Sequence, residues 1–297
     1  MTSATSERAT LASLRPGDRI EGVFACTRKD RLTARTGTPY LAVELRDRTG
    51  TLAARAFRDA DFLAGQFERG DLVRVRGQVE RFRDELQAEL REIRRVDLGT
   101  VDPGEFLPVA YRNLDELDGF LEHLAREVYD RDLRRLLDSL LADDAFRAEL
   151  RRAPCTRAGH HAYLGGLLEH TVAVTTLAQE VCTLHPRLDS DLLLAAAILH
   201  DVGKTREFTL GAEIGLSDEG RLLGHVTLGE RMVAESIEAV GGIPPARALG
   251  LLHCVVAHHG ADSLPGRRFG SAEALALYRL NSLDASVKGA LERGLGP

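Results

Sequence analysis

The second half of the sequence concentrates residue types that bind metal ions. Nine of the ten histidines lie at or after position 160. The most informative pair is His200-Asp201, which ends the apolar run 192–199 and is followed by Gly203 and Lys204. Burying an unpaired carboxylate costs free energy, and a bound cation would remove that cost. Taken alone, the pair also fits a helix C-terminus, where His200 complements the helix dipole and Gly203 provides the cap.

Other candidate ligands occur in similar settings, which favours the metal interpretation. His170 follows a Leu-Leu pair, His258-His259 close the apolar run 249–257, and Asp284 falls inside the helical pattern 274–287. A carboxylate-bridged pair of divalent cations needs about seven or eight such ligands from separate helices. Imidazole and carboxylate ligands without thiolate fit Mn²⁺, Fe²⁺, Co²⁺, Ni²⁺ or Zn²⁺.

The elements that must position these ligands belong to a chain long enough for two domains, at 297 residues. The net charge is −6, which excludes a global polycationic field that would attract nucleic acid. Residues 1–110 carry 19 Lys+Arg against 18 Asp+Glu, a net of +1, and residues 111–297 carry 20 against 27, a net of −7. Bound cations would balance part of the acidic excess in the second half.

Cysteine usage and the N-terminal sequence indicate the compartment. The four cysteines are far apart and form no C-x-x-C pair, which favours free buried thiols over disulfides or a zinc–thiolate site. The N-terminal segment lacks the apolar stretch of a signal peptide, and the run 192–199 is too short to span a bilayer. We therefore expect a cytoplasmic protein without membrane contact.

The hydrophobic pattern predicts two domains of different class. Residues 1–13 are expected to be a flexible tail. Strands are predicted at 19–26, 40–45, 51–57, 71–79 and 86–96, with a helix at 59–67 between the third and the fourth. That order is typical of a five-stranded OB-fold barrel, which we assign to residues 14–97. Residues 98–113 are rich in Gly and Pro and form a predicted linker.

Everything after Asn113 is predicted to be helical. Apolar residues recur at three-and-four spacing over 114–129, 133–141, 146–150 and 167–181. The predicted fold class is therefore multi-domain α+β, with an N-terminal OB-like β-barrel followed by an all-α helical bundle at 114–297.

Five blocks in this helical region occur in order and resemble the HD superfamily of metal-dependent phosphohydrolases: HHAYLGGLLEHT, AAILHDVGK, GRLLGHVTLG, VVAHHG and EALALYRLNSLDA. In the first half, RPGDRIEGVFACTRKD, LRDRTGTLAARAF and FERGDLVRVRGQVERF resemble OB domains that bind single-stranded nucleic acid. Over residues 14–290 the chain is similar to YhaM-type 3′→5′ exoribonucleases. The resemblance implies an OB-fold nucleic-acid-binding domain followed by an HD phosphohydrolase domain.

The resemblance also implies a set of metal ligands. On this sequence they are His170, His200, Asp201, His225, His258, His259 and Asp284. Two divalent cations would share Asp201, with Mn²⁺ as the expected metal. His170, His200 and Asp284 would complete the first set, and the other three histidines the second. HD proteins with a shorter pattern hold one metal, so the three additional histidines favour two.

The chemistry implied is phosphodiester hydrolysis. Two cations about 3.5–4 Å apart lower the pKa of a bridging water, and the resulting hydroxide would attack phosphorus in line. Lys204, three residues after Asp201, is expected to act with it as a catalytic residue and to contact a phosphate oxygen. Arg221 and His161 are further candidates for phosphate binding. The alternatives are a surface salt bridge for Arg221 and support of a metal ligand for His161.

Single-strand binding by the barrel would require a positive surface with aromatic platforms. The candidates comprise a predicted basic loop, two strand aromatics and residues near the turn between the last two strands. In that order they are Arg28, Lys29, Arg31 and Arg35, then Tyr40 and Phe57, then Arg81, Phe82 and Arg83. The alternative is that the aromatics belong to the core and that the arginines form a solvated face.

The sequence as a whole predicts a metal-dependent phosphodiesterase, a 3′→5′ exonuclease that hydrolyses single-stranded RNA to nucleoside 5′-monophosphates. Single-stranded DNA is a second candidate substrate, and a homo-oligomer is compatible with the sequence. One alternative is an HD phosphohydrolase acting on nucleotides or cyclic dinucleotides. The segment 260–262, Gly-Ala-Asp, departs from the Gly-Tyr-Pro signature of the cyclic-dinucleotide class. The other alternative is a non-catalytic OB-fold nucleic-acid-binding protein.

Overall fold

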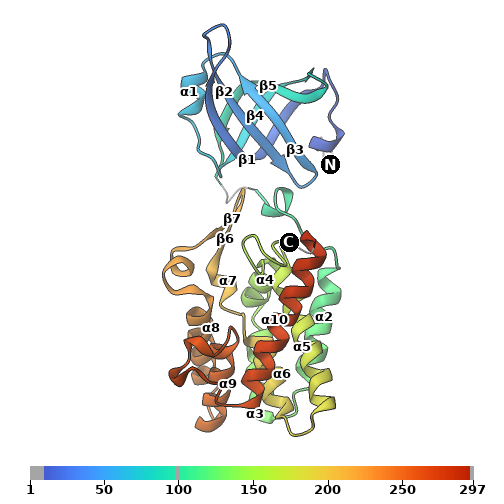
Figure 1. Ribbon diagram of the computed structural model, residues 1–297, viewed down its shortest axis with the longest axis vertical. Helices are drawn as coiled ribbons and strands as arrows, with labels where there is room; N and C mark the ends of the chain where they lie inside the picture. The colour runs from blue at the N-terminus through green and yellow to red at the C-terminus, as the bar shows by residue number, and fades with distance from the viewer. Residues whose placement is uncertain (1–9, 98–100, 295–297) are drawn as a thin grey trace, which may run out of the picture. The chain divides into compact units, whose positions relative to one another are not determined.

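The computed structural model describes residues 10–97 and 101–294 (Figure 1). The chain forms two compact units, Met1–Pro108 with Leu210–Ile214, and Val109–Thr209 with Gly215–Pro297. The first contains a closed five-stranded barrel and the second is mainly helical, so the predicted fold class is confirmed. Among the described residues, no helix has the length and apolar character needed to cross a membrane.

The barrel consists of β1 (Arg19–Thr33), β2 (Pro39–Asp47), β3 (Gly50–Ala56), β4 (Leu72–Phe82) and β5 (Glu85–Arg95), with helix α1 (Ala60–Ala64) between β3 and β4. Its strand order is β1-β2-β3-β5-β4, and β4 closes onto β1. Strands β3 and β5 pair in parallel, and the other neighbours are antiparallel. Alternate residues of β4 point inward, among them Val73, Val75 and Val79. The outward positions are therefore free to carry polar and aromatic side chains.

The predicted basic loop after the first strand is wrong. Strand β1 continues to Thr33, and residues 28–33 pair with β2. A register shift between Cys26 and Arg28 interrupts the alternation of side chains at this point. Beyond it, residues 31–33 are exposed, so this part of the strand has no apolar alternation from which a strand can be predicted.

Both segments that flank the barrel in the sequence are partly packed. In the predicted tail, residues 1–9 lie outside the described residues, but Leu11 of the 3₁₀ helix η1 (Leu11–Ser13) is buried, and its amide donates to Asp47 at 2.8 Å. In the predicted linker, residues 98–100 are likewise not described. Its remainder contains the 3₁₀ helix η3 (Pro103–Glu105) and the buried Phe106. A few apolar anchors are too sparse to produce a periodic pattern.

The helical unit contains nine described α-helices, which largely follow the predicted segments. They are α2 (Leu114–Arg126), α3 (Arg131–Leu141), α4 (Asp144–Arg152), α5 (Gly166–Leu184), α6 (Ser190–Leu199), α7 (Lys204–Glu207), α8 (Asp218–Val240), α9 (Pro245–Ala257) and α10 (Ala272–Arg293). The side chains of Asn113, Asp130 and Asp143 accept hydrogen bonds from the first turns of α2, α3 and α4, as expected of N-cap residues.

One part of this region contradicts the all-helical prediction. A short hairpin, β6 (Phe208–Leu210) and β7 (Ile214–Leu216), follows α7. Two 3₁₀ helices, η4 (Ala261–Ser263) and η5 (Pro265–Arg267), connect α9 to α10. Strands of three residues are too short for alternation to distinguish them from a helical turn.

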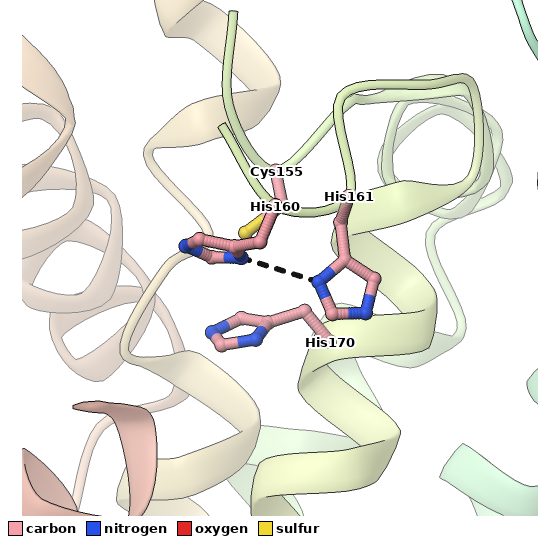
Figure 2. Close-up of side chains that lie close together, drawn as sticks. All are labelled: Cys155, His160, His161 and His170. Atoms are coloured by element: carbon pink, nitrogen blue, oxygen red, sulfur yellow. Dashed lines mark hydrogen bonds between the residues drawn. The ribbon is translucent and has the colours of Figure 1, made fainter. Parts of the chain in front are cut away.

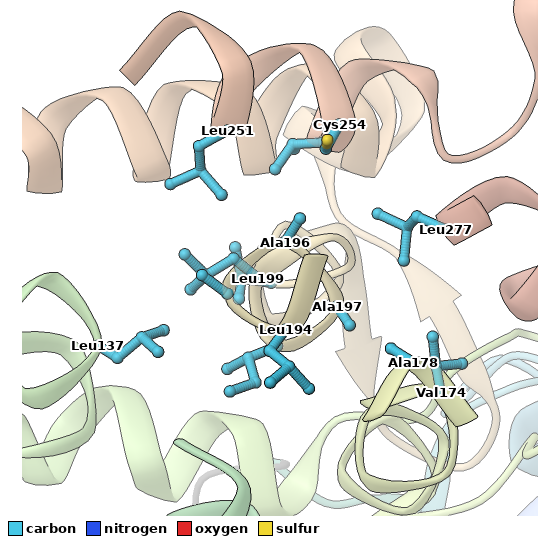
Figure 3. Close-up of a cluster of buried hydrophobic side chains, with 14 of the residues drawn as sticks. Leu137, Val174, Ala178, Leu194, Ala196, Ala197, Leu199, Leu251, Cys254 and Leu277 are labelled. Atoms are coloured by element: carbon cyan, nitrogen blue, oxygen red, sulfur yellow. The ribbon is translucent and has the colours of Figure 1, made fainter. Parts of the chain in front are cut away.

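Helix α6 occupies the centre of the helical core. Every residue of 192–199 is buried. Figure 3 shows Leu194, Ala196, Ala197 and Leu199 at the centre of a ring of apolar side chains. The labelled members of that ring are Leu137 from α3, Val174 and Ala178 from α5, Leu251 and Cys254 from α9, and Leu277 from α10. A helix that is apolar all round must be buried, so its C-terminal end delivers His200 and Asp201 into the interior.

A close backbone approach brings the end of this segment against α8. A Cβ atom at Gly203 would lie 2.1 Å from the carbonyl oxygen of His225 and 2.4 Å from the amide nitrogen of Gly229. Helix α8 is interrupted at Gly224, whose φ of 71° is left-handed. Together these glycines place the backbone of His225 beside the His200-Asp201 segment.

Replacing Leu194 by Ala is expected to lower the free energy of unfolding of the helical unit by about 2–5 kcal/mol, because a cavity would remain in its core. Leu222 on α8 is exposed, so Leu222→Ala is the matched control and should change the free energy by less than about 0.5 kcal/mol. Urea denaturation followed by circular dichroism measures both. Equal losses in the two variants would contradict the central position of α6.

Candidate metal centre

Two buried histidines are fixed in one tautomer by backbone carbonyl groups. The Nδ1 of His200 donates to the carbonyl oxygen of Ala197 at 2.8 Å, and the Nδ1 of His258 donates to that of Val255 at 2.5 Å. A carbonyl oxygen only accepts, so both Nδ1 atoms must carry the proton and both Nε2 atoms must be unprotonated in the neutral rings. Burial lowers the pKa of His258, which keeps that ring neutral.

A third histidine is fixed in the same way by a carboxylate. Glu207 is buried at the end of α7, and its Oε1 accepts from the Nδ1 of His225 at 3.0 Å and from the backbone amide of the same residue at 3.1 Å. The Nε2 of His225 therefore presents its lone pair away from Glu207, 2.8 Å from the Nε2 of His259. This pairing of carboxylate and imidazole is the arrangement that commonly orients a histidine toward a metal.

These lone pairs converge on the carboxylate of Asp201. The Nε2 of His200 lies 3.3 Å from Oδ2, and the Nε2 atoms of His258 and His225 lie 3.3 and 3.6 Å from Oδ1. The Nε2 of His170 lies 3.5 Å from Oδ2 and 3.3 Å from that of His200. Two groups able to hold a cation therefore share Asp201: His170 and His200 on one side, and His225, His258 and His259 on the other.

The donor set fits a divalent cation on electrostatic grounds. Asp201 Oδ1 and His258 Nε2 are both buried, and neither has a hydrogen-bond partner within the part of the chain that the structure describes. Both are acceptors, so at 3.3 Å they repel each other. A cation between them would bond to both and remove the cost of burying them.

The charge of Asp201 is maintained by its surroundings. Burial alone would raise its pKa, but the positive charge of Lys204 holds the pKa well below the usual range of a carboxyl group. Burial would lower the pKa of Lys204, but Asp201, 2.7 Å from its Nζ, raises that pKa above its ordinary value. The structure therefore holds an ionised carboxylate and an ammonium group side by side in the interior.

Asp284 lies beside this centre rather than in either of the two groups. Its Oδ2 is 2.6 Å from the Nδ1 of His170, and burial raises its pKa. On the same face of α10, three residues earlier, the Oδ1 of Asn281 is 3.0 Å from the Nε2 of His170. Both nitrogens of His170 are thus held from α10, and direct ligation by Asp284 remains a prediction.

The three residues predicted to bind phosphate lie in different environments. Lys204 is only 5% exposed, and its ammonium group contacts Asp201 and the sulfur of Cys155, 3.4 Å away. His161 is 1% exposed, with its Nδ1 3.9 Å from Asp284. Arg221 is exposed and forms an ion pair with Asp218 at 2.6 Å, which is the surface salt bridge considered as its alternative. Of these residues, the structure brings Lys204 and His161 to the centre and leaves Arg221 paired on the surface.

On the barrel, four of the predicted nucleic-acid contacts gather around one arginine. The guanidinium of Arg55 lies 5.8 Å from the ring centre of Tyr40 and 5.0 Å from that of Phe82. Tyr40 and Phe57 lie 5.3 Å apart, centre to centre, and Arg83 lies 5.3 Å from Phe82. We call Tyr40, Arg55, Phe57, Phe82 and Arg83 the aromatic–arginine cluster.

The predicted basic residues of β1 do not join this cluster through any contact that the described residues show. Lys29 donates to the carbonyl oxygen of Phe67 at 2.6 Å and to Glu68 at 3.0 Å. Arg28 pairs with Asp30, and Arg31 pairs with Asp61. Arg35 and Arg81 are exposed. Lys29, Arg28 and Arg31 therefore have local acidic or carbonyl partners, and Arg28 and Arg31 lie on an exposed face.

Four residues at these sites are not predicted from the sequence: Asn281, Glu207, Cys155 and Arg55. Asn281 carries a usable signal, because it lies three positions before Asp284 and so on the same helical face. Glu207 and Cys155 carry none, because they reach His225 and Lys204 only through the turns of the fold. Arg55 was one arginine among many on the barrel and had no distinguishing spacing.

The chain matches two family models. Residues 167–285 match the model described as HD domain, and residues 22–96 match the model described as OB-fold nucleic acid binding domain. Among solved structures, the mitochondrial single-stranded DNA binding protein Rim1 of S. cerevisiae is 14% identical over 28% of this chain and 97% of its own, with a TM-score of 0.25.

Curated relatives match nearly the whole chain. The 3′-5′ exoribonuclease YhaM of Listeria innocua is 27% identical over 91% of this chain and 86% of its own length. The proteins of the same name from Halalkalibacterium halodurans and Bacillus subtilis are each 28% identical over 91% of this chain, and over 84% and 86% of their own lengths. The chain thus combines an OB-fold domain with an HD domain, and the resemblance inferred from the sequence is confirmed.

Replacing Glu207 by Ala is expected to weaken binding of one divalent cation by about 10–100-fold, because His225 would lose the acceptor that fixes its tautomer. Glu207→Gln keeps an oxygen acceptor and should recover part of the affinity. Calorimetric titration of Mn²⁺ into the metal-free protein measures both, with Glu219→Ala on the exposed first turn of α8 as the control. Unchanged affinity in Glu207→Ala would contradict the orienting role.

Proposed function

We propose that this chain is a metal-dependent exonuclease that removes nucleotides from the 3′ end of single-stranded RNA. The observation that carries the proposal is the convergence of imidazole lone pairs on both oxygens of the buried Asp201. The HD-domain and OB-fold matches and the names of the curated relatives support the same activity. Single-stranded DNA is a second substrate in this proposal, because hydrolysis by a metal-activated water needs no 2′-hydroxyl group.

Two divalent cations per chain, Mn²⁺ in this proposal, would be held on the two sides of Asp201. His170 and His200 would serve one cation, with Asp284 as its predicted further ligand, and His225, His258 and His259 would serve the other. Such a pair, when bound, supplies an activated water and neutralises charge on a phosphodiester group. The chain's contribution is to hold the ligands in fixed tautomers before the substrate arrives.

Lys204 has a positioning role in this proposal. Its ammonium group is 2.7 Å from Asp201 Oδ2, so it holds the carboxylate in one orientation and keeps it ionised. The same positive charge lies beside the candidate metal centre and would attract the negative oxygens of a phosphodiester group. Lys204 therefore favours an anionic substrate at this centre over a neutral one.

The barrel favours a polymer over a free nucleotide or a cyclic dinucleotide. The guanidinium group of Arg55 lies over the rings of Tyr40 and Phe82. Aromatic rings and arginine side chains grouped in this way provide stacking surfaces for successive bases. Phe57 and Phe82 are 39% and 43% exposed, so part of each side chain is accessible to solvent. A small-molecule substrate would leave this cluster without a role.

The test of the activity is the digestion of single-stranded RNA labelled at its 5′ end, in the presence of Mn²⁺. Native protein is expected to produce a ladder that shortens from the 3′ end. Asp201→Asn and His225→Gln are each expected to reduce the rate by more than about 100-fold, because each removes a ligand from the centre. The isosteric Asp138→Asn, at an exposed position on α3, is the control.

Two results would contradict the proposal. One is intact RNA after incubation with folded native protein that has bound Mn²⁺. The other is unchanged digestion by both ligand variants, which would place the activity elsewhere or in a contaminant. Asp201→Asn leaves Lys204 without its charged partner and could be destabilised for that reason alone. His225 is partly exposed, so His225→Gln is expected to fold and keeps the test decisive.

Replacing Arg55 or Phe82 by Ala is expected to weaken binding of single-stranded RNA by about 5–150-fold, which corresponds to the loss of about 1–3 kcal/mol for each stacked base. Fluorescence anisotropy with a labelled oligonucleotide, without divalent cations, measures binding separately from cleavage. Phe62→Ala is the control, since Phe62 is an exposed phenylalanine on α1 without contact to the cluster in the described structure. Equal affinities in all three variants would exclude the cluster as the binding surface.

A further inference from the structure

A second cluster of metal-binding side chains lies next to the centre at Asp201. It consists of Cys155, His160 and His161, from the loop between α4 and α5, with His170 of α5 beside them (Figure 2). One ligand atom of each of these four residues lies within 4.8 Å of the others. Neither Cys155 nor His160 was assigned to a metal by the sequence reasoning, which disfavoured a thiolate site altogether.

The loop holds these side chains in place through its own backbone. The amide of Cys155 donates to the carbonyl oxygen of His161 at 3.0 Å, which closes the loop. Within it, the Oγ1 of Thr156 donates to the carbonyl oxygen of His160 at 2.7 Å and accepts from the amide of Gly159 at 2.8 Å. The ligand side chains therefore project from a closed, hydrogen-bonded turn.

Contacts from outside the loop fix the position of His161. Its backbone is left-handed, with a φ of 51°, and its amide donates to Glu292 of α10 at 3.0 Å. A Cβ atom at Gly166 would lie 2.2 Å from the carbonyl oxygen of His161. This close backbone approach at Gly166 places the ring of His161 against that of His170, with 5.5 Å between the ring centres.

The spacing of the ring nitrogens matches the edge of a metal tetrahedron. The Nδ1 atoms of His160 and His161 face each other at 3.2 Å, as the dashed line in Figure 2 shows. Two nitrogens bound tetrahedrally at about 2.0–2.1 Å from zinc are about 3.3 Å apart. The sulfur of Cys155 lies behind the His160 ring in the same view. One thiolate and two imidazoles are a ligand set that zinc accepts and that Mn²⁺ does not favour.

We propose that Cys155, His160 and His161 bind a third cation, of the thiolate-binding kind represented by Zn²⁺, beside the pair assigned to Asp201. On binding, the Cys155 thiol would release its proton to solvent and the sulfur would become the thiolate ligand. Three protein ligands leave one tetrahedral position for water or a substrate oxygen. His170 is not part of this site, because its Nδ1 faces Asp284 and its Nε2 faces Asn281 and His200.

The charges around the cluster are compatible with this assignment. The ammonium group of Lys204 is 3.4 Å from the sulfur of Cys155 and would donate a hydrogen bond to the thiolate. On the other side, the carboxylate of Asp284 is 3.9 Å from the Nδ1 of His161 and would offset the cation. The site therefore has a donor for its sulfur and a counter-charge for its metal.

The spectroscopic test uses Cd²⁺, whose thiolate complexes absorb in the ultraviolet through charge transfer. Full-length, metal-free protein is titrated with Cd²⁺ in the absence of RNA, so the outcome does not depend on the proposed nuclease activity. We expect one thiolate band in the native protein that is lost in Cys155→Ser and retained in Cys182→Ser. Cys182 is the matched control because it lies on α5, outside every metal-ligand group found among the described residues.

A second variant keeps the test decisive if Cys155→Ser does not fold. His160 is only partly buried. The Cd²⁺ affinity measured from the thiolate band is expected to be at least 10-fold weaker in His160→Gln than in the native protein. Metal analysis after equilibration with Zn²⁺ should show one fewer zinc per chain in His160→Gln than in the native protein. The inference is overturned by the absence of a thiolate band in the native protein, by its retention in Cys155→Ser, or by equal zinc contents.

Discussion

The rest of the structure depends on one buried carboxylate, that of Asp201. Its two oxygens face the Nε2 atoms of His200, His225 and His258, and the Nδ1 atoms of these rings donate to backbone carbonyls or to Glu207. Acceptors that face one another in a water-poor interior are unfavourable unless a positive charge lies among them. Lys204 supplies one such charge on the Oδ2 side, whereas Oδ1 and the Nε2 of His258 have no hydrogen-bond partner among the described residues. A folded chain that retains this arrangement fits a bound divalent cation.

The arrangement of the helices places the carboxylate of Asp201 in the interior of the helical unit. Helix α6 is apolar on all sides and is surrounded by α3, α5, α9 and α10, so its last turn ends in the core. Ligands from α5, α8 and α9 then approach from separate directions, and the glycines at 203 and 224 allow α8 to come within backbone contact. The barrel provides a different kind of surface. Its alternating strands bury one face and leave the other for Arg55 and the rings beside it.

Much of this arrangement was predictable from the sequence, and the exceptions have physical reasons. The apolar run 192–199 predicted the central helix, and the five-block resemblance predicted the histidines that the fold gathers around Asp201. The hairpin of β6 and β7 is too short to leave an alternating pattern, and the outer part of β1 is too exposed. Glu207 and Cys155 reach the centre through turns whose course no local pattern encodes. Asp284 was assigned to the centre, but the rotation of α10, which places its carboxylate on the Nδ1 side of His170, is set by tertiary packing.

The central claim is that Asp201 is shared between two cations. The most direct measurement is the anomalous diffraction of a crystal grown with Mn²⁺, recorded at the manganese absorption edge. The account predicts two anomalous peaks, each marking one manganese ion. One ion is bonded to each oxygen of Asp201, and the Nε2 atoms of His200 and His258 are bonded to different ions. A single peak, or two peaks that leave either oxygen of Asp201 without a metal, would contradict it.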